Sequence, residues 1–106
     1  MTQAPLSWQA MSRPIVCMAP MDGITDTAYR RIVRGFAPEI VLFSEFTSAD
    51  GFLRSAKVRS RLDYHPDEHP YFVQLFGNTP EAFAEAARAL EQQGVAGIDI
   101  NMGCPA

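Results

Sequence analysis

The sequence has few of the residues that build disulfide scaffolds, metal sites or membrane spans. Its 106 residues include two cysteines and two histidines, and Cys17 and Cys104 stand far apart, without the short spacing of metal ligands. No run approaches the ~20 consecutive apolar residues that a transmembrane helix needs. We therefore expect no metal, no membrane partner and a reduced, cytoplasmic setting.

The sequence also has little excess of charge of either sign. Nine Lys and Arg against twelve Asp and Glu give a formal charge of −3, so the overall charge gives no reason to expect a nucleic-acid or membrane partner. The one basic segment is 54–61. On a continuous helix, Arg54, Lys57 and Arg61 would share a face that either contacts phosphates or is simply solvated.

Hydrophobic periodicity predicts alternating strands and helices after a flexible leader, residues 1–13, which lacks a signal-peptide pattern. Strands are predicted at 15–19, 40–43, 71–76 and 96–101, and a moderately helical segment at 49–62. The helix after the first strand has an apolar stripe of Tyr29, Ile32, Val33 and Phe36. The helix after the third strand begins near Thr79 and Pro80, and its stripe is Phe83, Ala86, Ala87 and Leu90. Thr25 or Asp26 is the predicted cap of the first helix.

This order is typical of a parallel α/β unit with right-handed crossovers. A doubly wound sheet would usually carry a glycine-rich loop after its first strand, but residues 19–23 hold one glycine and a proline. We therefore predict the N-terminal half of a (β/α)8 TIM barrel, incomplete in this chain, over residues 14–106. A whole barrel needs ~250 residues. Four strands alone would leave two open edges, which favours aggregation or swapping.

Active sites of parallel barrels lie at the carboxyl ends of the strands, and all four predicted strands carry polar or soft groups there. These are Pro20, Met21 and Asp22, then Ser44 and Glu45, then Gln74, then Asn101 and Cys104. The Met21 thioether suits contact with a flat ring such as a flavin, and the Gln74 amide suits the mixed edge of a flavin or a base. A plain strand-to-helix turn and a satisfied interior amide are equally open.

Alternation along the fourth strand points Asn101, like Asp99, into the barrel and Ile98 and Ile100 toward the covering helices. Glu45 has three open roles: catalysis, ligand binding, or pairing with an arginine of the basic segment.

Cys104 lies between a glycine and a proline, which predicts a tight exit loop. A thiol of ordinary pKa, near ~8.5, is mostly protonated at neutral pH and can act as a general acid. A nucleophilic thiolate would need a nearby cation, and the two histidines, His65 and His69, are predicted to lie at the surface of a different loop. A buried, inert cysteine is the alternative for Cys104 and the preferred interpretation of Cys17.

Three segments, residues 19–26, 74–77 and 99–105, together resemble the motifs of the tRNA-dihydrouridine synthases in order and spacing. The resemblance covers residues 14–106, and its most specific part is the Asn-Met-Gly-Cys-Pro run that begins at Asn101. It implies an FMN-bearing (β/α)8 barrel that uses NADPH to reduce uridines of tRNA to 5,6-dihydrouridine.

In this family, reduced flavin passes hydride from N5 to C6 of the uracil, and the motif cysteine protonates C5; Cys104 occupies that position. The resemblance also implies that the flavin is held by Pro20, Met21, Asp22 and Gln74, with Asn101 close to flavin and uracil. The family's later lysine and histidine, its flavin-phosphate loops and its RNA-binding domain fall beyond Ala106. We therefore expect a fragment of the enzyme, inactive by itself.

Two alternatives stay open. Barrels of the dihydroorotate dehydrogenase type also bind FMN and carry an Asn-rich motif ending in Cys-Pro, although Met102-Gly103 and the Pro20–Asp22 opening favour the RNA-modifying family. Alternatively, the chain is a natural short product that acts as a non-catalytic binding module through residues 54–61. Neither the modified uridine nor the oligomeric state is specified by the sequence.

Overall fold

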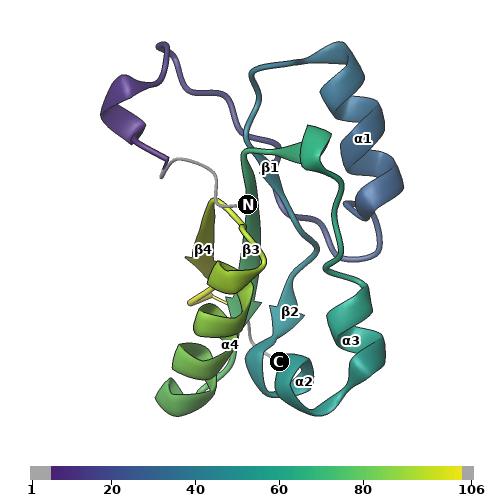
Figure 1. Ribbon diagram of the computed structural model, residues 1–106, viewed down its shortest axis with the longest axis vertical. Helices are drawn as coiled ribbons and strands as arrows, with labels where there is room; N and C mark the ends of the chain where they lie inside the picture. The colour runs from purple at the N-terminus through teal and green to yellow at the C-terminus, as the bar shows by residue number, and fades with distance from the viewer. Residues whose placement is uncertain (1–5, 104–106) are drawn as a thin grey trace.

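The chain folds into a parallel sheet with helices packed along it (Figure 1). This computed structural model describes residues 6–103. The elements are η1 (Trp8–Ala10), α1 (Thr27–Phe36), β1 (Leu42–Phe43), β2 (Thr47–Ser48), α2 (Ala49–Arg54), α3 (Ala56–Ser60), η2 (Pro66–Glu68), β3 (Tyr71–Phe76), α4 (Pro80–Gln92) and β4 (Gly97–Ile100). The predicted parallel α/β class is confirmed, since β1, β2 and β4 all pair with β3 in parallel.

β3 is the centre of the sheet and occupies the predicted residues. β1 and β2 lie along one side of it and β4 along the other. β1 and β2 are two pieces of one strand, because Leu42 pairs with Tyr71 and Thr47 pairs with Leu75, which leaves one extra residue on the β1–β2 side. Such a bulge redirects side chains at the point where it occurs.

The predicted first strand, residues 15–19, forms a shorter ladder than expected. Cys17 and Val41 make a single parallel bridge, and backbone bonds join Met18 and Val16 to Val41. The segment therefore lies beside Val41, at the start of the next strand in the chain. Successive strands are neighbours, as in a barrel. The prediction that Cys17 is buried is wrong: its side chain is exposed. Within residues 6–103, this segment pairs with a strand on one side only.

The hydrophobic core lies between the sheet, α2 and α4. Tyr71, Val73 and Leu75 point to this side of β3. The helices contribute Ala49, Phe52, Ala82, Ala86 and Leu90, and Leu62 closes the cluster. The predicted stripe of α4 is thus largely confirmed. Since side chains alternate along a strand, the opposite, inner face of β3 carries Phe72, Gln74 and Phe76.

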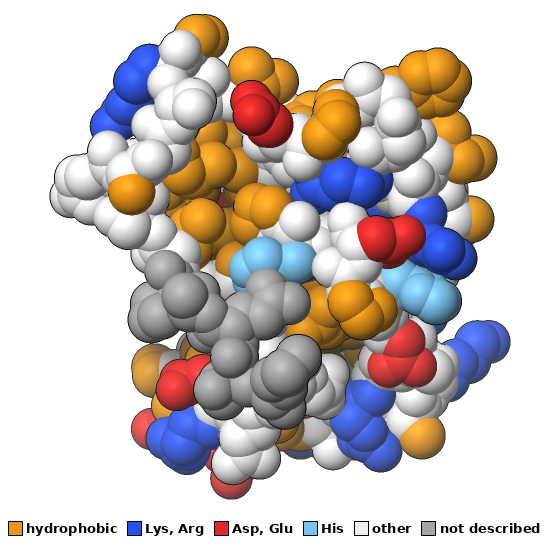
Figure 2. Space-filling model, turned by 45° about the horizontal axis from the view of Figure 1, so that its top comes forward, with side chains coloured by type: hydrophobic (Ala, Val, Ile, Leu, Met, Phe, Trp, Pro, Cys, Tyr) orange, Lys and Arg blue, Asp and Glu red, His pale blue; other side chains and the backbone are white. Residues whose placement is uncertain are grey.

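α1 packs through a charged side chain, not through its predicted apolar stripe. Arg30 is fully buried, whereas Ile32 and Phe36 are 63% and 89% exposed. Figure 2 shows hydrophobic side chains at the surface of the face that it views. The stripe prediction is wrong because the orientation of α1 is set by the partners of Arg30.

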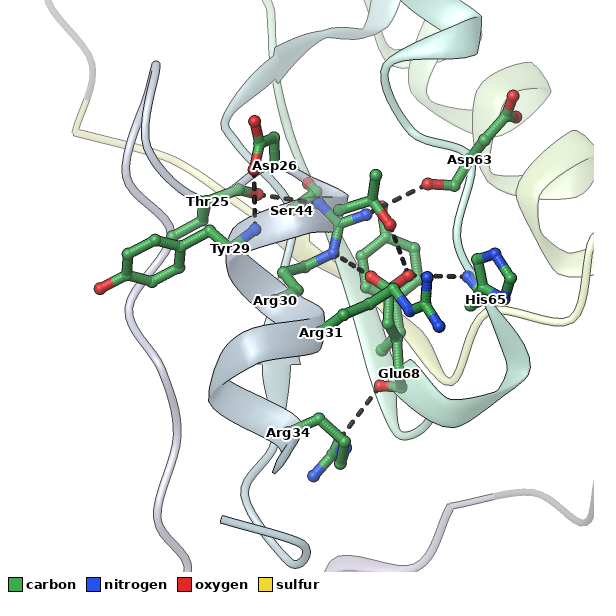
Figure 3. Close-up of polar contacts among 12 residues, drawn as sticks. Thr25, Asp26, Tyr29, Arg30, Arg31, Arg34, Ser44, Asp63, His65 and Glu68 are labelled. Carbon is green, nitrogen blue, oxygen red and sulfur yellow. Dashed lines mark hydrogen bonds and ion pairs between the residues drawn. The ribbon is translucent and has the colours of Figure 1, made fainter. Parts of the chain in front are cut away.

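Arg30 and Glu68 form an ion pair that is fully buried on both sides, with Arg30 Nε 2.5 Å from Glu68 Oε1 (Figure 3). The other carboxylate oxygen accepts hydrogen bonds from the Thr27 hydroxyl at 2.6 Å and the His65 backbone N–H at 2.7 Å. A buried carboxylate needs such additional donors to offset its lost hydration. Glu68 therefore fixes the loop before β3 against α1.

The N–H groups of the Arg30 guanidinium likewise have hydrogen-bond partners. It donates to the backbone carbonyls of Thr25 and Asp63 at 2.8 and 3.1 Å, and it lies over the Tyr71 ring, 4.5 Å from the centroid. One turn later, Arg34 donates to the carbonyls of Asp67 and Glu68. Two arginines of α1 thus clamp the segment that leads into β3.

The basic segment is split between two short helices. α2 ends at Arg54 and α3 begins at Ala56, with Ser55 capping both. The predicted common face of Arg54, Lys57 and Arg61 is therefore not formed, although all three side chains are exposed. Within residues 6–103, no helix is both long and apolar enough to cross a membrane.

The two histidines differ in their surroundings. His65 is exposed as predicted, but His69 is half-buried, and its Nδ1 is buried without a hydrogen-bond partner among the described residues. Burial, and secondarily the Arg34 charge, lower the pKa of His69. The surface prediction is wrong for His69, because the segment that carries it is clamped by α1.

Removal of Glu68 should strongly destabilise the fold. In the full-length natural protein, Glu68→Ala leaves Arg30 buried without its counter-ion, and we expect a loss of about 3–5 kcal/mol in the free energy of unfolding. Urea denaturation measures it. The matched control is Asp67→Ala, which removes the exposed pair with Arg31 and should cost less than about 1 kcal/mol. Equal effects of the two changes would contradict the structural role of the buried pair.

The stability of the protein should also fall in mild acid because of His69. Its pKa is lowered on folding, so the unfolded chain binds a proton more readily as the pH drops through ~6.5, and the stabilisation present above that pH is lost below it. We expect His69→Gln to flatten the fall in unfolding free energy from neutral pH into mild acid. The exposed His65→Gln variant should keep the wild-type slope. An unchanged slope in the His69 variant would refute this expectation.

Candidate functional site

Hydrogen bonds join the carboxyl-end segments of the successive strands into one continuous series. We call its side chains the inner polar row: Ser44, Glu45, Gln74, Asp99 and Asn101. Glu45 Oε1 accepts from the Gly23 N–H at 2.7 Å, and Ser44 Oγ accepts from the Gln74 N–H at 3.0 Å. Gln74 Nε2 donates to Asp99 Oδ2 at 2.6 Å, and Asn101 Nδ2 lies 3.5 Å from Gln74 Oε1. Of the predicted site residues, Gln74 and Asn101 are therefore in contact.

The loop after the first strand is a tight turn. The N–H groups of Ile24 and Thr25 donate to the Met21 carbonyl at 3.1 and 3.0 Å, and Gly23 has φ +74°, a conformation that favours glycine. Asp26 accepts from the Tyr29 N–H and caps α1, as one of the two predicted caps. The turn leaves Pro20 and Met21 half-buried and Asp22 exposed.

The bulge between β1 and β2 explains how Glu45 reaches this turn. At the bulge, the hydroxyl of Ser44 takes the place of a backbone acceptor for Gln74, and the next side chain, Glu45, is directed to Gly23. In residues 6–103, Glu45 forms no ion pair with the basic segment. The observed contact is none of its three predicted roles: Glu45 ties the turn at Gly23 to the segment between β1 and β2. Catalysis and ligand binding by Glu45 stay predictions.

Gln74 and Asp99 lie side by side on the neighbouring strands β3 and β4. They are direct partners in the β3–β4 register, and the Gln74 side chain is only 8% exposed. Asp99 was not predicted as a site residue, although its alternation with Asn101 on one strand face was the available signal. The predicted inward orientation of these two polar side chains is confirmed by their bonds to Gln74.

Aromatic rings border the inner polar row. Toward the amino ends of the strands, Phe72 contacts Phe43 and Trp8 with ring centroids 5.2 and 5.3 Å apart. Toward the carboxyl ends, Phe46 stacks on Phe76 at 4.5 Å. Gly97 makes room for the Phe72 ring, because a Cβ at that position would lie 2.5 Å from Phe72 Cε2. The polar row is thus set between apolar layers of the inner face.

A hollow of ≈ 360 Å³ opens at the carboxyl ends of β2, β3 and β4. Its lining residues are Ser48, Asp50, Phe76, Gly77, Asn78, Asn101 and Met102. Asn101 is therefore the member of the inner polar row that reaches the rim directly. Its Oδ1 accepts from the Gly103 N–H at 2.9 Å, which turns the chain just after β4. Among the described residues, no three His, Cys, Asp or Glu side chains group as metal ligands do.

Cys104 lies outside the described residues, as does Pro105. Its orientation and its role as an acid therefore stay predictions.

Comparison with known proteins gives a consistent result. A family model described as "Dihydrouridine synthase (Dus)" matches residues 17–106. A "Probable tRNA-dihydrouridine synthase" from Staphylococcus aureus is 40% identical to this chain, one from Staphylococcus epidermidis 38%, and a "Probable tRNA-dihydrouridine synthase 2" from Bacillus subtilis 35%. Each match covers 92% of this chain and 31% of the relative, so the chain spans about a third of their length.

Loss of the Ser44 hydroxyl should weaken the centre of the site. Ser44→Ala leaves the buried Gln74 N–H without its acceptor, and an unsatisfied buried donor costs about 1–3 kcal/mol. We expect that loss in the unfolding free energy of the full-length protein. Ser60→Ala, which removes an exposed hydroxyl bonded to the Lys57 carbonyl, is the control and should change little. A Ser44 variant as stable as this control would show that the hydroxyl does not hold the bulge to β3.

Proposed function

The chain belongs to the dihydrouridine synthase family, and from this premise we propose that it serves in the FMN- and NADPH-dependent reduction of uridine in tRNA to 5,6-dihydrouridine. The activity is proposed for a protein of the family's full length, because this sequence covers 31% of its relatives. The family is a (β/α)8 barrel, and the parallel order of strands around β3 fits its first part.

The observation that carries the proposal is the meeting of two side-chain amides, Gln74 and Asn101, beside a hollow at the carboxyl ends of the strands. Two amides supply both acceptors and donors to a flat heteroaromatic ring. The half-buried thioether of Met21 and the Phe76 ring, which lines the hollow, suit the faces of such a ring. These residues therefore fit an isoalloxazine, with Pro20 and Asp22 on the adjoining loop.

Within the proposal, bound FMN, reduced by NADPH, supplies the hydride that is added to uracil C6. The chain's own contribution is a proton for C5, held on the Cys104 thiol three residues after Asn101. Hydride at C6 and proton at C5 together saturate the C5–C6 bond, so atoms and electrons balance. A neutral thiol serves this purpose without a cation to lower its pKa.

The two alternatives receive less support. The relatives' names specify tRNA as the substrate, which favours RNA over dihydroorotate. The non-catalytic module depends on the basic segment, whose predicted common face is broken at Ser55. We also propose tRNA and NADPH as partners and the cytoplasm as the location.

The direct test is Cys104→Ala in the full-length protein. We expect dihydrouridine formation in unmodified tRNA to fall by about 10²–10⁴-fold, the usual contribution of a general acid, with flavin content unchanged in the visible absorbance spectrum. Cys17→Ala, which alters the exposed cysteine at the sheet edge, is the matched control and should keep full activity. Unchanged turnover in the Cys104 variant would remove the acid role, and absence of FMN from the wild-type protein would refute the proposed function itself.

A further inference from the structure

We propose that Asp99 is a positioning residue: it holds the Gln74 amide so that the carbonyl oxygen, not the NH2 group, faces Asn101, which lines the hollow. The inner polar row then presents an acceptor beside a donor, the complement of a cyclic imide edge. This inference rests on the proposed function and adds a residue to the site.

The Asp99 contact fixes the polarity of Gln74. An ionised carboxylate only accepts hydrogen bonds, so the group 2.6 Å from Asp99 Oδ2 must be the NH2 of Gln74. Hydrogen bonds with one ionised partner are short and about twice as strong as neutral ones. Asp99 also stands directly opposite Gln74 in the β3–β4 register, which holds the two side chains together. The amide oxygen of Gln74 is thereby directed away from Asp99.

Asn101 is fixed in the opposite sense. Its Oδ1 accepts from the Gly103 N–H at 2.9 Å, so its NH2 group points the other way, toward Gln74 Oε1. That second contact is long, 3.5 Å, and it leaves Gln74 Oε1 with spare acceptor capacity and Asn101 Nδ2 with a spare proton. One acceptor, Gln74 Oε1, and one donor, Asn101 Nδ2, therefore lie 3.5 Å apart with hydrogen-bonding capacity to spare.

An acceptor next to a donor matches an N–H next to a C=O. The pyrimidine ring of a flavin has this imide edge, and so does the uracil base, so the chemistry is shared by cofactor and substrate. Without Asp99, a half-turn of the Gln74 amide would set NH2 against the imide N–H. At 8% exposure, little water is available to relieve such a mismatch.

The test uses the full-length apoprotein and measures FMN affinity by quenching of flavin fluorescence. We expect Asp99→Ala to weaken FMN binding about tenfold to a hundredfold, the usual cost of leaving a buried hydrogen-bonding group without its partner. Asp99→Asn should recover part of that loss, since its amide oxygen can accept from Gln74 Nε2. Glu85→Ala, on the exposed face of α4, is the control and should bind as wild type does.

A second probe, FMN methylated at N3, identifies the group that is recognised. The wild-type protein should prefer FMN to the methylated form, and Asp99→Ala should lose most of that preference. If FMN affinity is unaffected but kcat/KM for tRNA falls in Asp99→Ala and recovers in Asp99→Asn, the recognised imide is that of uracil, which also supports the inference.

Two results would overturn the inference: wild-type FMN affinity and kcat/KM in Asp99→Ala, or no recovery by Asp99→Asn. If the thermal unfolding curve shows that Asp99→Ala does not fold, Asp99→Leu takes its place, because it keeps the branched shape of the side chain and removes the acceptor. A wild-type protein that binds no FMN would refute the proposed function, not the orientation of Gln74, so the two failures are distinguishable.

Discussion

The parallel pairing of β3 on both of its sides is the constraint on which the other features depend. Alternation along this strand sends Tyr71, Val73 and Leu75 into the core beneath α2 and α4 and leaves Phe72, Gln74 and Phe76 on the inner face. A slip of one residue would exchange the two faces and would place the Gln74 amide among hydrophobic helices. The register of β3 therefore determines both the core and the inner polar row.

The buried ion pair supports that register from outside the sheet. Glu68 is three residues before β3, and Arg30 holds it against α1. Because breaking a buried pair costs far more than breaking an exposed one, the entry point of β3 is fixed by charge and not by apolar packing of α1. This also accounts for the exposure of Ile32 and Phe36, whose helix face is turned away from the sheet.

Local signals predicted most elements, and long-range contacts account for the errors. The apolar run of β3 and the Thr79-Pro80 start of α4 were sufficient to place both. The stripe of α1 misled because no periodicity reveals an arginine whose partner is 38 residues away. The same limit applies to Asp99 and Glu45. Their positions near strand ends were predictable, but their partners, Gln74 in β3 and Gly23 in the turn after the first strand, are distant in the sequence. The exposure of Cys17 likewise depends on how many strands flank it.

The central claim is that the carboxyl-end rim, with the Gln74 and Asn101 amides at its base, holds a flavin within reach of the Cys104 sulfur. The most direct measurement is a crystal structure of the full-length protein with FMN. The account predicts the pyrimidine edge of the flavin within hydrogen-bonding distance of the inner polar row, with Cys104 Sγ facing the same space. A flavin bound elsewhere, or a Cys104 Sγ directed toward the outer helices, would contradict it.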